Sequence, residues 1–85
     1  MKEFDYVVKD ELGIHARPAG LLAKEAKKYS STCTITKNGV SKKLTQLMMI
    51  MSLGVKKGET VTIKAEGADE DAAIEGLKAF FEANL

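Results

Sequence analysis

The sequence predicts an α+β fold in which helices pack on one face of an antiparallel sheet. Short segments with alternating apolar and polar residues predict strands, and longer segments with apolar residues at helical spacing predict helices. Between two of the predicted strands lies Asn38-Gly39, the strongest β-hairpin signal in the chain, because both turn positions need a positive φ. Taken in order, the predicted elements are β-α-β-β-α-β-α.

The first third of the chain predicts a strand, a loop and a helix. Glu3 to Lys9 alternates loosely, which predicts a strand, whereas Asp10 to Ile14 predicts a loop. Ala16 to Tyr29 carries small and apolar residues at helical spacing on one face and lysines on the others. Pro18 has no N–H to donate and is tolerated only near a helix start, so this helix should begin within a few residues of His15.

The middle of the chain predicts a hairpin followed by a short helix. Thr32 to Lys37 alternates as a strand, and Val40 to Lys43 is the expected return strand. Leu47, Ile50 and Met51 have the i, i+3, i+4 spacing of one helical face, so we expect them to face the core.

The last part of the chain predicts one more strand and a final helix. Val61 to Ala65 alternates with polar residues after a turn at Lys57-Gly58. Asp69 is the predicted N-cap of the helix, and the acidic residues that follow suit its positive end. The expected core-facing residues of this helix are Ala73, Ile74, Leu77, Phe80 and Phe81.

Length and composition limit what the protein can do. Its 85 residues predict a single domain, residues 1–85, without room for both a core and a buried active-site cleft. A net charge of +1 argues against a protein that binds nucleic acids by neutralising phosphates. Cys33 is the only cysteine, so we expect no internal disulfide and no cysteine-based metal cluster. We expect no metal ion or cofactor. Leu44 to Val55 is too short and too interrupted to span a bilayer, so we expect no direct membrane insertion. The N-terminus lacks the apolar run of a signal peptide, and both observations favour a cytoplasmic location.

The residues most suggestive of chemistry surround His15, the only histidine, where a loop enters the helix that Pro18 marks. The first N–H groups of a helix have no internal acceptors, and together with the helix dipole they form an anion-binding site. The N–H groups of Ala16 and Arg17 are therefore placed to receive the oxygens of a phosphoryl group on His15. The guanidinium of Arg17 adds a rigid fork of donors that matches phosphate geometry.

Each of these residues also has an ordinary explanation. A lone histidine near a helix end is more often a cap or a surface residue than a nucleophile, a lone arginine is more often solvated, and a proline there marks only the helix start. Together, the residues indicate an anion site beside a nucleophilic imidazole.

Several segments, spread over nearly the whole chain, carry a resemblance to a known family. They are Gly13-Ile14-His15-Ala16-Arg17-Pro18-Ala19, Met48, Met51-Ser52-Leu53-Gly54-Val55, Lys57-Gly58 and Ala65-Glu66-Gly67-Ala68-Asp69-Glu70. In these segments the sequence resembles the HPr family, the histidine-containing phosphocarriers of the bacterial phosphoenolpyruvate–sugar phosphotransferase system. The resemblance implies an open-faced β-sandwich with four antiparallel strands covered on one side by three helices.

The same resemblance implies a phosphoryl relay. Enzyme I, which draws on phosphoenolpyruvate, would phosphorylate His15 on Nδ1, Arg17 would stabilise the phosphoryl group, and the group would pass to the IIA domains of sugar permeases. Such a protein carries a covalent phosphohistidine but is not a stand-alone turnover catalyst. An enzyme acting alone is disfavoured because the chain has one histidine and no metal-ligand cluster.

The resemblance further implies a docking surface around the first two helices. Its residues would be Ala16, Arg17, Gly20, Leu21, Lys24, Lys27, Leu47, Met48 and Met51. Flexible methionines suit a surface that fits several partners, and lysines steer acidic partners, although each lysine alone fits a solvated helix face equally well. The alternative for the methionines is that they fill a small core, which the shared stripe with Ile50 favours for Met51. We expect a monomer, because the docking surface must stay free.

One position departs from the pattern of many Gram-positive relatives. Where those proteins carry a regulatory serine at the start of the second helix, this chain has Gln46, and an amide cannot be phosphorylated. Serine-based regulation should therefore be absent or altered. The alternative to sugar transport is an HPr-like regulatory module that signals through phosphorylation of His15.

Overall fold

The computed structural model describes all 85 residues, and its helices and strands follow the predicted order. The strands are β1 (Lys2–Val7), β2 (Thr32–Lys37), β3 (Val40–Lys43) and β4 (Thr60–Glu66). The helices are α1 (Ala16–Ala26), α2 (Leu47–Ser52) and α3 (Glu70–Asn84). None of the three helices combines the length and the apolar character needed to cross a bilayer.

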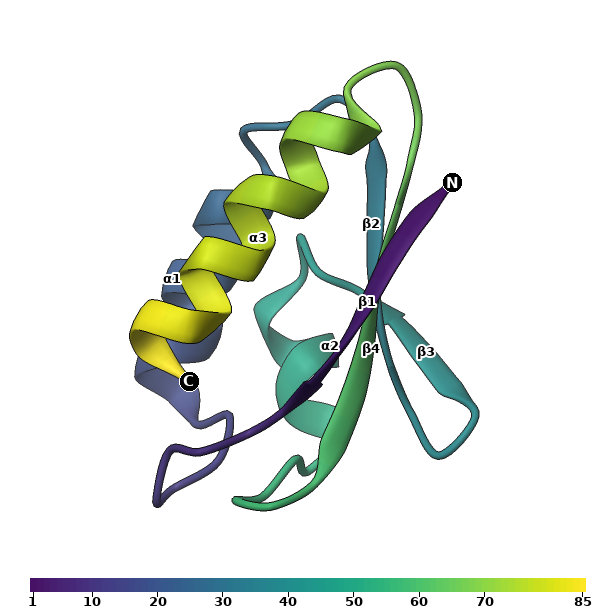
Figure 1. Cartoon of the computed structure of the whole chain (residues 1–85). Coiled ribbons are helices and arrows are strands. Elements are labelled where there is room, and N and C mark those ends of the chain that lie inside the picture. The colour runs from purple at the N-terminus through teal and green to yellow at the C-terminus, as the bar shows by residue number, and fades with distance from the viewer.

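The four strands form one sheet in the order β1-β4-β2-β3, with every neighbouring pair antiparallel. All three helices lie on the same side of this sheet, which leaves the other side uncovered (Figure 1). The predicted open-faced sandwich is thus confirmed. Asn38 and Gly39 have φ values of 50° and 81°, as the predicted tight hairpin turn requires.

The core lies between the sheet and the helices, and alternation along the strands decides which residues enter it. Val61, Ile63 and Ala65 of β4 are fully buried, as are most of the predicted apolar residues of α1 and α3. Phe81 of α3 is the largest fully buried side chain, and aromatic rings at Phe4, Tyr6 and Phe80 contact it edge to face.

Two expectations about helices need correction. Helix α1 ends at Ala26, not at Tyr29, because the chain turns there. In α2 only Ile50 is buried, whereas Leu47 and Met51 are more than a third exposed, so the prediction that all three face the core was wrong. A helix of 6 residues is too short to bury a whole stripe at the edge of the core.

Asp69 occupies the predicted N-cap position of α3, but its side chain does not cap the helix. Its carboxylate instead accepts hydrogen bonds from the backbone N–H groups of Ser30 and Ser31, each at 2.9 Å, and from the Ser31 hydroxyl. These bonds join the start of α3 to the turn between α1 and β2. They lower the pKa of Asp69, because hydrogen bonds to a carboxylate favour its charged form, the Ser31 hydroxyl foremost.

Candidate functional site

His15 is the N-cap residue of α1, and two backbone contacts hold the loop that leads to it. The Gly13 N–H donates to the Asp10 carbonyl at 2.9 Å, and the Ile14 N–H donates to the Val55 carbonyl at 3.0 Å. Gly13 adopts a φ of +68°, which a glycine tolerates without strain. His15 itself is extended, with φ −96° and ψ −177°, as is usual for an N-cap.

The first turn of α1 leaves free hydrogen-bond donors beside the imidazole. The His15 side chain makes no capping bond to the helix, and the N–H groups of Ala16 and Arg17 have no acceptor within the protein. Pro18 follows as the third helical residue and is buried, which fixes the start of the helix. The site therefore offers two backbone donors, aligned with the positive end of the helix, to an anion on His15.

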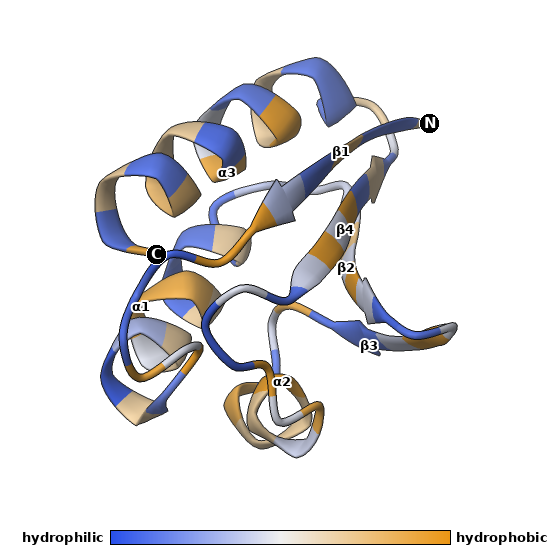
Figure 2. Ribbon diagram, turned by 60° about the horizontal axis from the view of Figure 1, so that its bottom comes forward, coloured by the Kyte–Doolittle hydropathy of each residue, from blue (hydrophilic) through white to orange (hydrophobic).

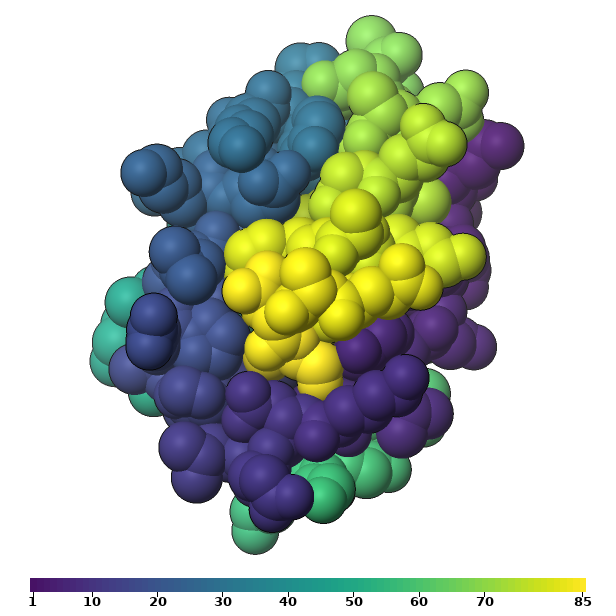
Figure 3. Space-filling view, turned by 60° about the vertical axis from the view of Figure 1, so that its left-hand side comes forward, coloured from purple at the N-terminus to yellow at the C-terminus, as the bar shows by residue number.

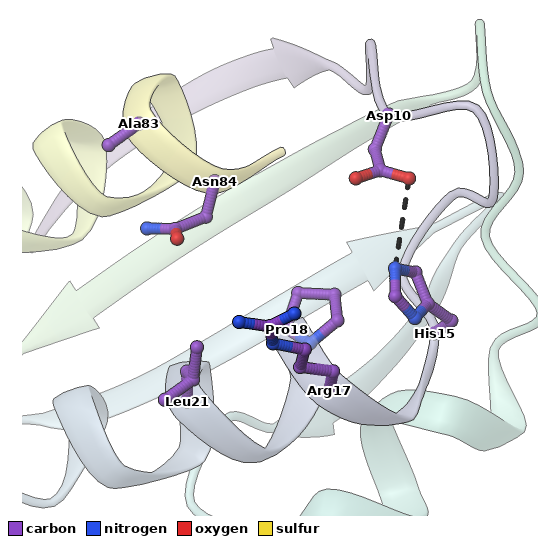
Figure 4. Close-up of a pocket in the computed structure, with 7 residues that line it drawn as sticks. All are labelled: Asp10, His15, Arg17, Pro18, Leu21, Ala83 and Asn84. Atoms are coloured by element: carbon purple, nitrogen blue, oxygen red, sulfur yellow. Dashed lines mark ion pairs between the residues drawn. The ribbon is translucent and has the colours of Figure 1, made fainter.

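Arg17 is the only arginine of the chain, and its guanidinium is free to bind a ligand. The residue is exposed and takes part in none of the ion pairs of the protein. It lines the same pocket as His15, so both side chains face a common space (Figure 4). That arrangement provides one nucleophile and one fork of cationic donors.

The pocket beside His15 is open and has a volume of about 250 Å³. Its lining residues are Asp10, His15, Arg17, Pro18, Leu21, Ala83 and Asn84. The end of α3 thus forms one wall, and Figure 3 shows this C-terminal end, in yellow, lying against the purple segment that follows β1. Sequence reasoning gave no signal for Ala83 and Asn84, because only the folded chain brings α3 to His15.

Asp10 is a further residue of the site whose position the sequence did not reveal. Its Oδ1 lies 3.7 Å from Nε2 of His15, and neither side chain is more than about a third exposed. From the sequence, a loop carboxylate at this position is expected to be solvated. The local signal is the turn in which Asp10 Oδ1 accepts the Leu12 N–H at 2.8 Å, since aspartate favours such turns.

The residues of the expected docking surface lie on α1, on its C-cap Lys27 and on α2, and the two helices pack side by side. Ala16, Arg17, Lys24 and Lys27 are exposed, and Gly20 is half-buried. Leu21, Leu47, Met48 and Met51 are 46%, 37%, 74% and 38% exposed. In Figure 2 α2 is coloured orange and tan over most of its length, so an almost wholly apolar helix forms part of this surface.

Lys37 holds α2 in its place. Its Nζ donates to the carbonyls of Leu53 and Gly54 at 3.2 and 3.1 Å, at the C-terminal end of α2. The same ammonium lies 2.9 Å from Glu59, and this contact, with a bond from the Lys56 N–H, lowers the pKa of Glu59. A cation at the negative end of a helix stabilises it.

No three side chains of His, Cys, Asp or Glu are grouped so that they would hold a metal ion.

A family model, a related protein and two solved structures all indicate the same family for this chain. A family model described as "PTS HPr component phosphorylation site" matches residues 2–83. The phosphocarrier protein HPr of Mycoplasma genitalium is 45% identical over 85 residues, which cover 99% of this chain and 97% of that protein. The structure of HPr-C-His from Thermoanaerobacter tengcongensis is 41% identical, with a TM-score of 0.93 over 98% of this chain and 93% of that one. An HPr dimer from the same organism is also 41% identical, with a TM-score of 0.78 over 98% and 95% of the two chains.

Proposed function

This chain belongs to the HPr family of phosphocarrier proteins of the phosphotransferase system, and we propose that His15 is its phosphoacceptor. In this proposal Enzyme I delivers the phosphoryl group to Nδ1 of His15, and His15 passes it to the IIA domains of sugar permeases. The observation that carries the proposal is the position of the imidazole, which is accessible and lies at the N-terminus of α1 next to two unpaired N–H groups.

The electrostatics of the site suit a phosphoryl group that is bound only transiently. A phosphoryl group on His15 brings roughly two negative charges at neutral pH, by analogy with other phosphorylated residues. The Ala16 and Arg17 amides, the helix dipole and the Arg17 guanidinium all favour an anion there. Because the pocket is open, these donors hold the group without enclosing it, which a relay needs.

The partners would dock on the surface formed by α1 and α2. Leu47, Met48 and Met51 provide an apolar centre, and Lys24 and Lys27 provide a cationic rim. Methionine side chains adapt to differently shaped surfaces, so one patch can serve both Enzyme I and IIA domains. We propose that the chain acts as a monomer, although a relative has been solved as a dimer.

Regulation through a serine at the start of α2 is not part of this proposal. Gln46 is the N-cap of α2, and its exposed side chain makes no capping hydrogen bond. Its amide offers no hydroxyl for a kinase. A module that signals through phosphorylated His15 is the second candidate function, and complementation of sugar uptake in a strain lacking HPr separates the two.

The test of the proposed function is phosphorylation by purified Enzyme I and phosphoenolpyruvate. The wild type should incorporate one acid-labile phosphoryl group, and the variant His15→Ala should incorporate none. A loaded wild type should then lose the group to a IIA domain. Incorporation that survives in His15→Ala would assign the phosphoryl group to another residue and overturn the proposal.

A further inference from the structure

We propose that Asp10 is a positioning residue for phosphoryl transfer: its carboxylate holds the Nε2–H of His15, so that the lone pair of Nδ1 is the free nucleophile. The carboxylate then offsets the positive charge that the ring acquires when Nδ1 binds phosphorus. This inference rests on the proposed role of His15 as the phosphoacceptor, and it concerns how this particular chain prepares that residue.

The geometry of the ring supports the assignment. Asp10 Oδ1 lies 3.7 Å from Nε2, and Asp10 is the only carboxylate within ion-pair distance of the imidazole. Figure 4 shows the Nε2 edge of the ring turned to Asp10 and the second nitrogen on the side turned away. A neutral imidazole carries one N–H, so a proton shared with Asp10 at Nε2 leaves the lone pair on Nδ1. A contact of this length shortens to a hydrogen bond with a small rotation, as catalytic contacts often do when a partner binds.

Asp10 is itself held in place by its backbone and its side chain. Its N–H donates to an oxygen of Leu85 at 2.9 Å, and its carbonyl accepts the Gly13 N–H at 2.9 Å. Its Oδ1 accepts the Leu12 N–H at 2.8 Å. The two backbone bonds hold residue 10 in place, and the bond from the Leu12 N–H orients its carboxylate on the side of His15.

The neighbouring carboxylate has a different role, which makes it a matched control. Glu11 is exposed and its Oε1 lies 2.7 Å from the ammonium of Lys57, with no contact to the imidazole. It carries the same charge, one residue away from Asp10. An effect of charge alone on docking would therefore be reproduced at Glu11, whereas an effect on the ring would not.

The lone pair of Nδ1 forms the N–P bond while the bond between phosphorus and the donor protein breaks, and the donor keeps that electron pair. The ring retains its proton on Nε2 and now carries a positive charge, which the Asp10 carboxylate offsets. In the reverse direction the electrons of the N–P bond return to Nδ1, and the ring leaves as a neutral imidazole.

Three variants test this inference: Asp10→Ala, Asp10→Asn and Glu11→Gln. Nitrogen-15 NMR of the imidazole reports the tautomer, and single-turnover transfer from saturating phosphorylated Enzyme I reports the rate. Asp10→Ala should raise the fraction of the Nδ1–H tautomer and slow the transfer about tenfold, the effect expected for one lost hydrogen bond to a charged group. Asp10→Asn keeps an acceptor for Nε2–H and for the Leu12 amide. It should keep the loop and the wild-type tautomer, yet transfer more slowly than wild type because the charge is gone.

Glu11→Gln should match the wild type in both measurements. A wild-type rate in both Asp10 variants, an unchanged tautomer in Asp10→Ala, or an equal loss of rate in Glu11→Gln would overturn the inference. Failure of this inference is distinguishable from failure of the proposed function. If the proposed function were wrong, the wild type itself would accept no phosphoryl group, or His15→Ala would accept one.

Discussion

Gly13 lies so close to Val55 that a Cβ at position 13 would be 2.1 Å from the Val55 carbonyl oxygen. The same oxygen accepts the Ile14 N–H at 3.0 Å. The loop before His15 is therefore held against the segment after α2 only because residue 13 has no side chain, and the position of the imidazole depends on this contact.

Gly13→Ala should lower the free energy of unfolding by about 2–4 kcal/mol, since it combines a backbone clash with a φ of +68° that alanine tolerates poorly. Gly20→Ala is the matched comparison, because a Cβ at Gly20 of α1 meets nothing within 4 Å. Alanine there should raise the free energy of unfolding by about 0.5–1 kcal/mol. Urea unfolding measures both values, and equal effects of the two substitutions would refute the role given to Gly13.

Arg17→Glu should slow phosphoryl transfer at least about tenfold, because it removes a charge-assisted donor and places a like charge beside the phosphoryl group. Arg17 is exposed and unpaired, so the melting temperature should stay within a few degrees of the wild type. Lys78→Glu, at an exposed position of α3, is the control for net charge. Transfer by Arg17→Glu at the rate of Lys78→Glu would remove Arg17 from the site.

What the sequence predicted well depends on local patterns. The hairpin at Asn38-Gly39 and the strand at Val61 to Ala65 follow from rules that act over a few residues, and both were confirmed. The placing of His15 directly before a helix follows in the same way from Pro18.

What the sequence did not reveal depends on contacts between distant segments. Asp10 and Asn84 come from opposite ends of the chain and share the pocket of His15 only after folding. Met51 was expected in the core, but it is 38% exposed, because a helix of only 6 residues does not bury its whole apolar stripe. Asp69 is at the predicted N-cap position, yet its carboxylate binds the turn at Ser30-Ser31. A local sequence pattern cannot predict a hydrogen bond between residues that are 38 or more positions apart.

Asp69 should make the protein less stable at low pH. Its pKa is lowered from the ordinary value of 3.8, so its contribution is complete above that value and is lost as the pH falls through the lower native value. Asp69→Asn should therefore cost more stability at pH 7 than at pH 2. Thermal unfolding of the wild type and of Asp69→Asn at pH 7 and pH 2 measures the difference. If both proteins lost the same stability between pH 7 and pH 2, the role given to Asp69 would be contradicted.

Lys37→Met should release the C-terminal end of α2. The ammonium bonds to the Leu53 and Gly54 carbonyls and to Glu59, so its loss should lower the free energy of unfolding by about 1–3 kcal/mol. The pKa of Glu59 should rise toward its ordinary value, because the Lys37 hydrogen bond is the largest cause of its depression. Urea unfolding and NMR titration measure these two effects.

The same substitution should weaken the proposed docking, because α2 carries Met48 and Met51 on the surface expected to meet Enzyme I. The KM of phosphorylated Enzyme I for the protein should rise, while the rate at saturation stays near that of the wild type, since Lys37 does not line the pocket of His15. Lys43→Met, at an exposed position of β3 without an ion pair, removes the same charge and should change neither stability nor KM appreciably. If Lys43→Met raised KM as much as Lys37→Met, the effect would come from overall charge, and the bracing of α2 by Lys37 would have no part in docking.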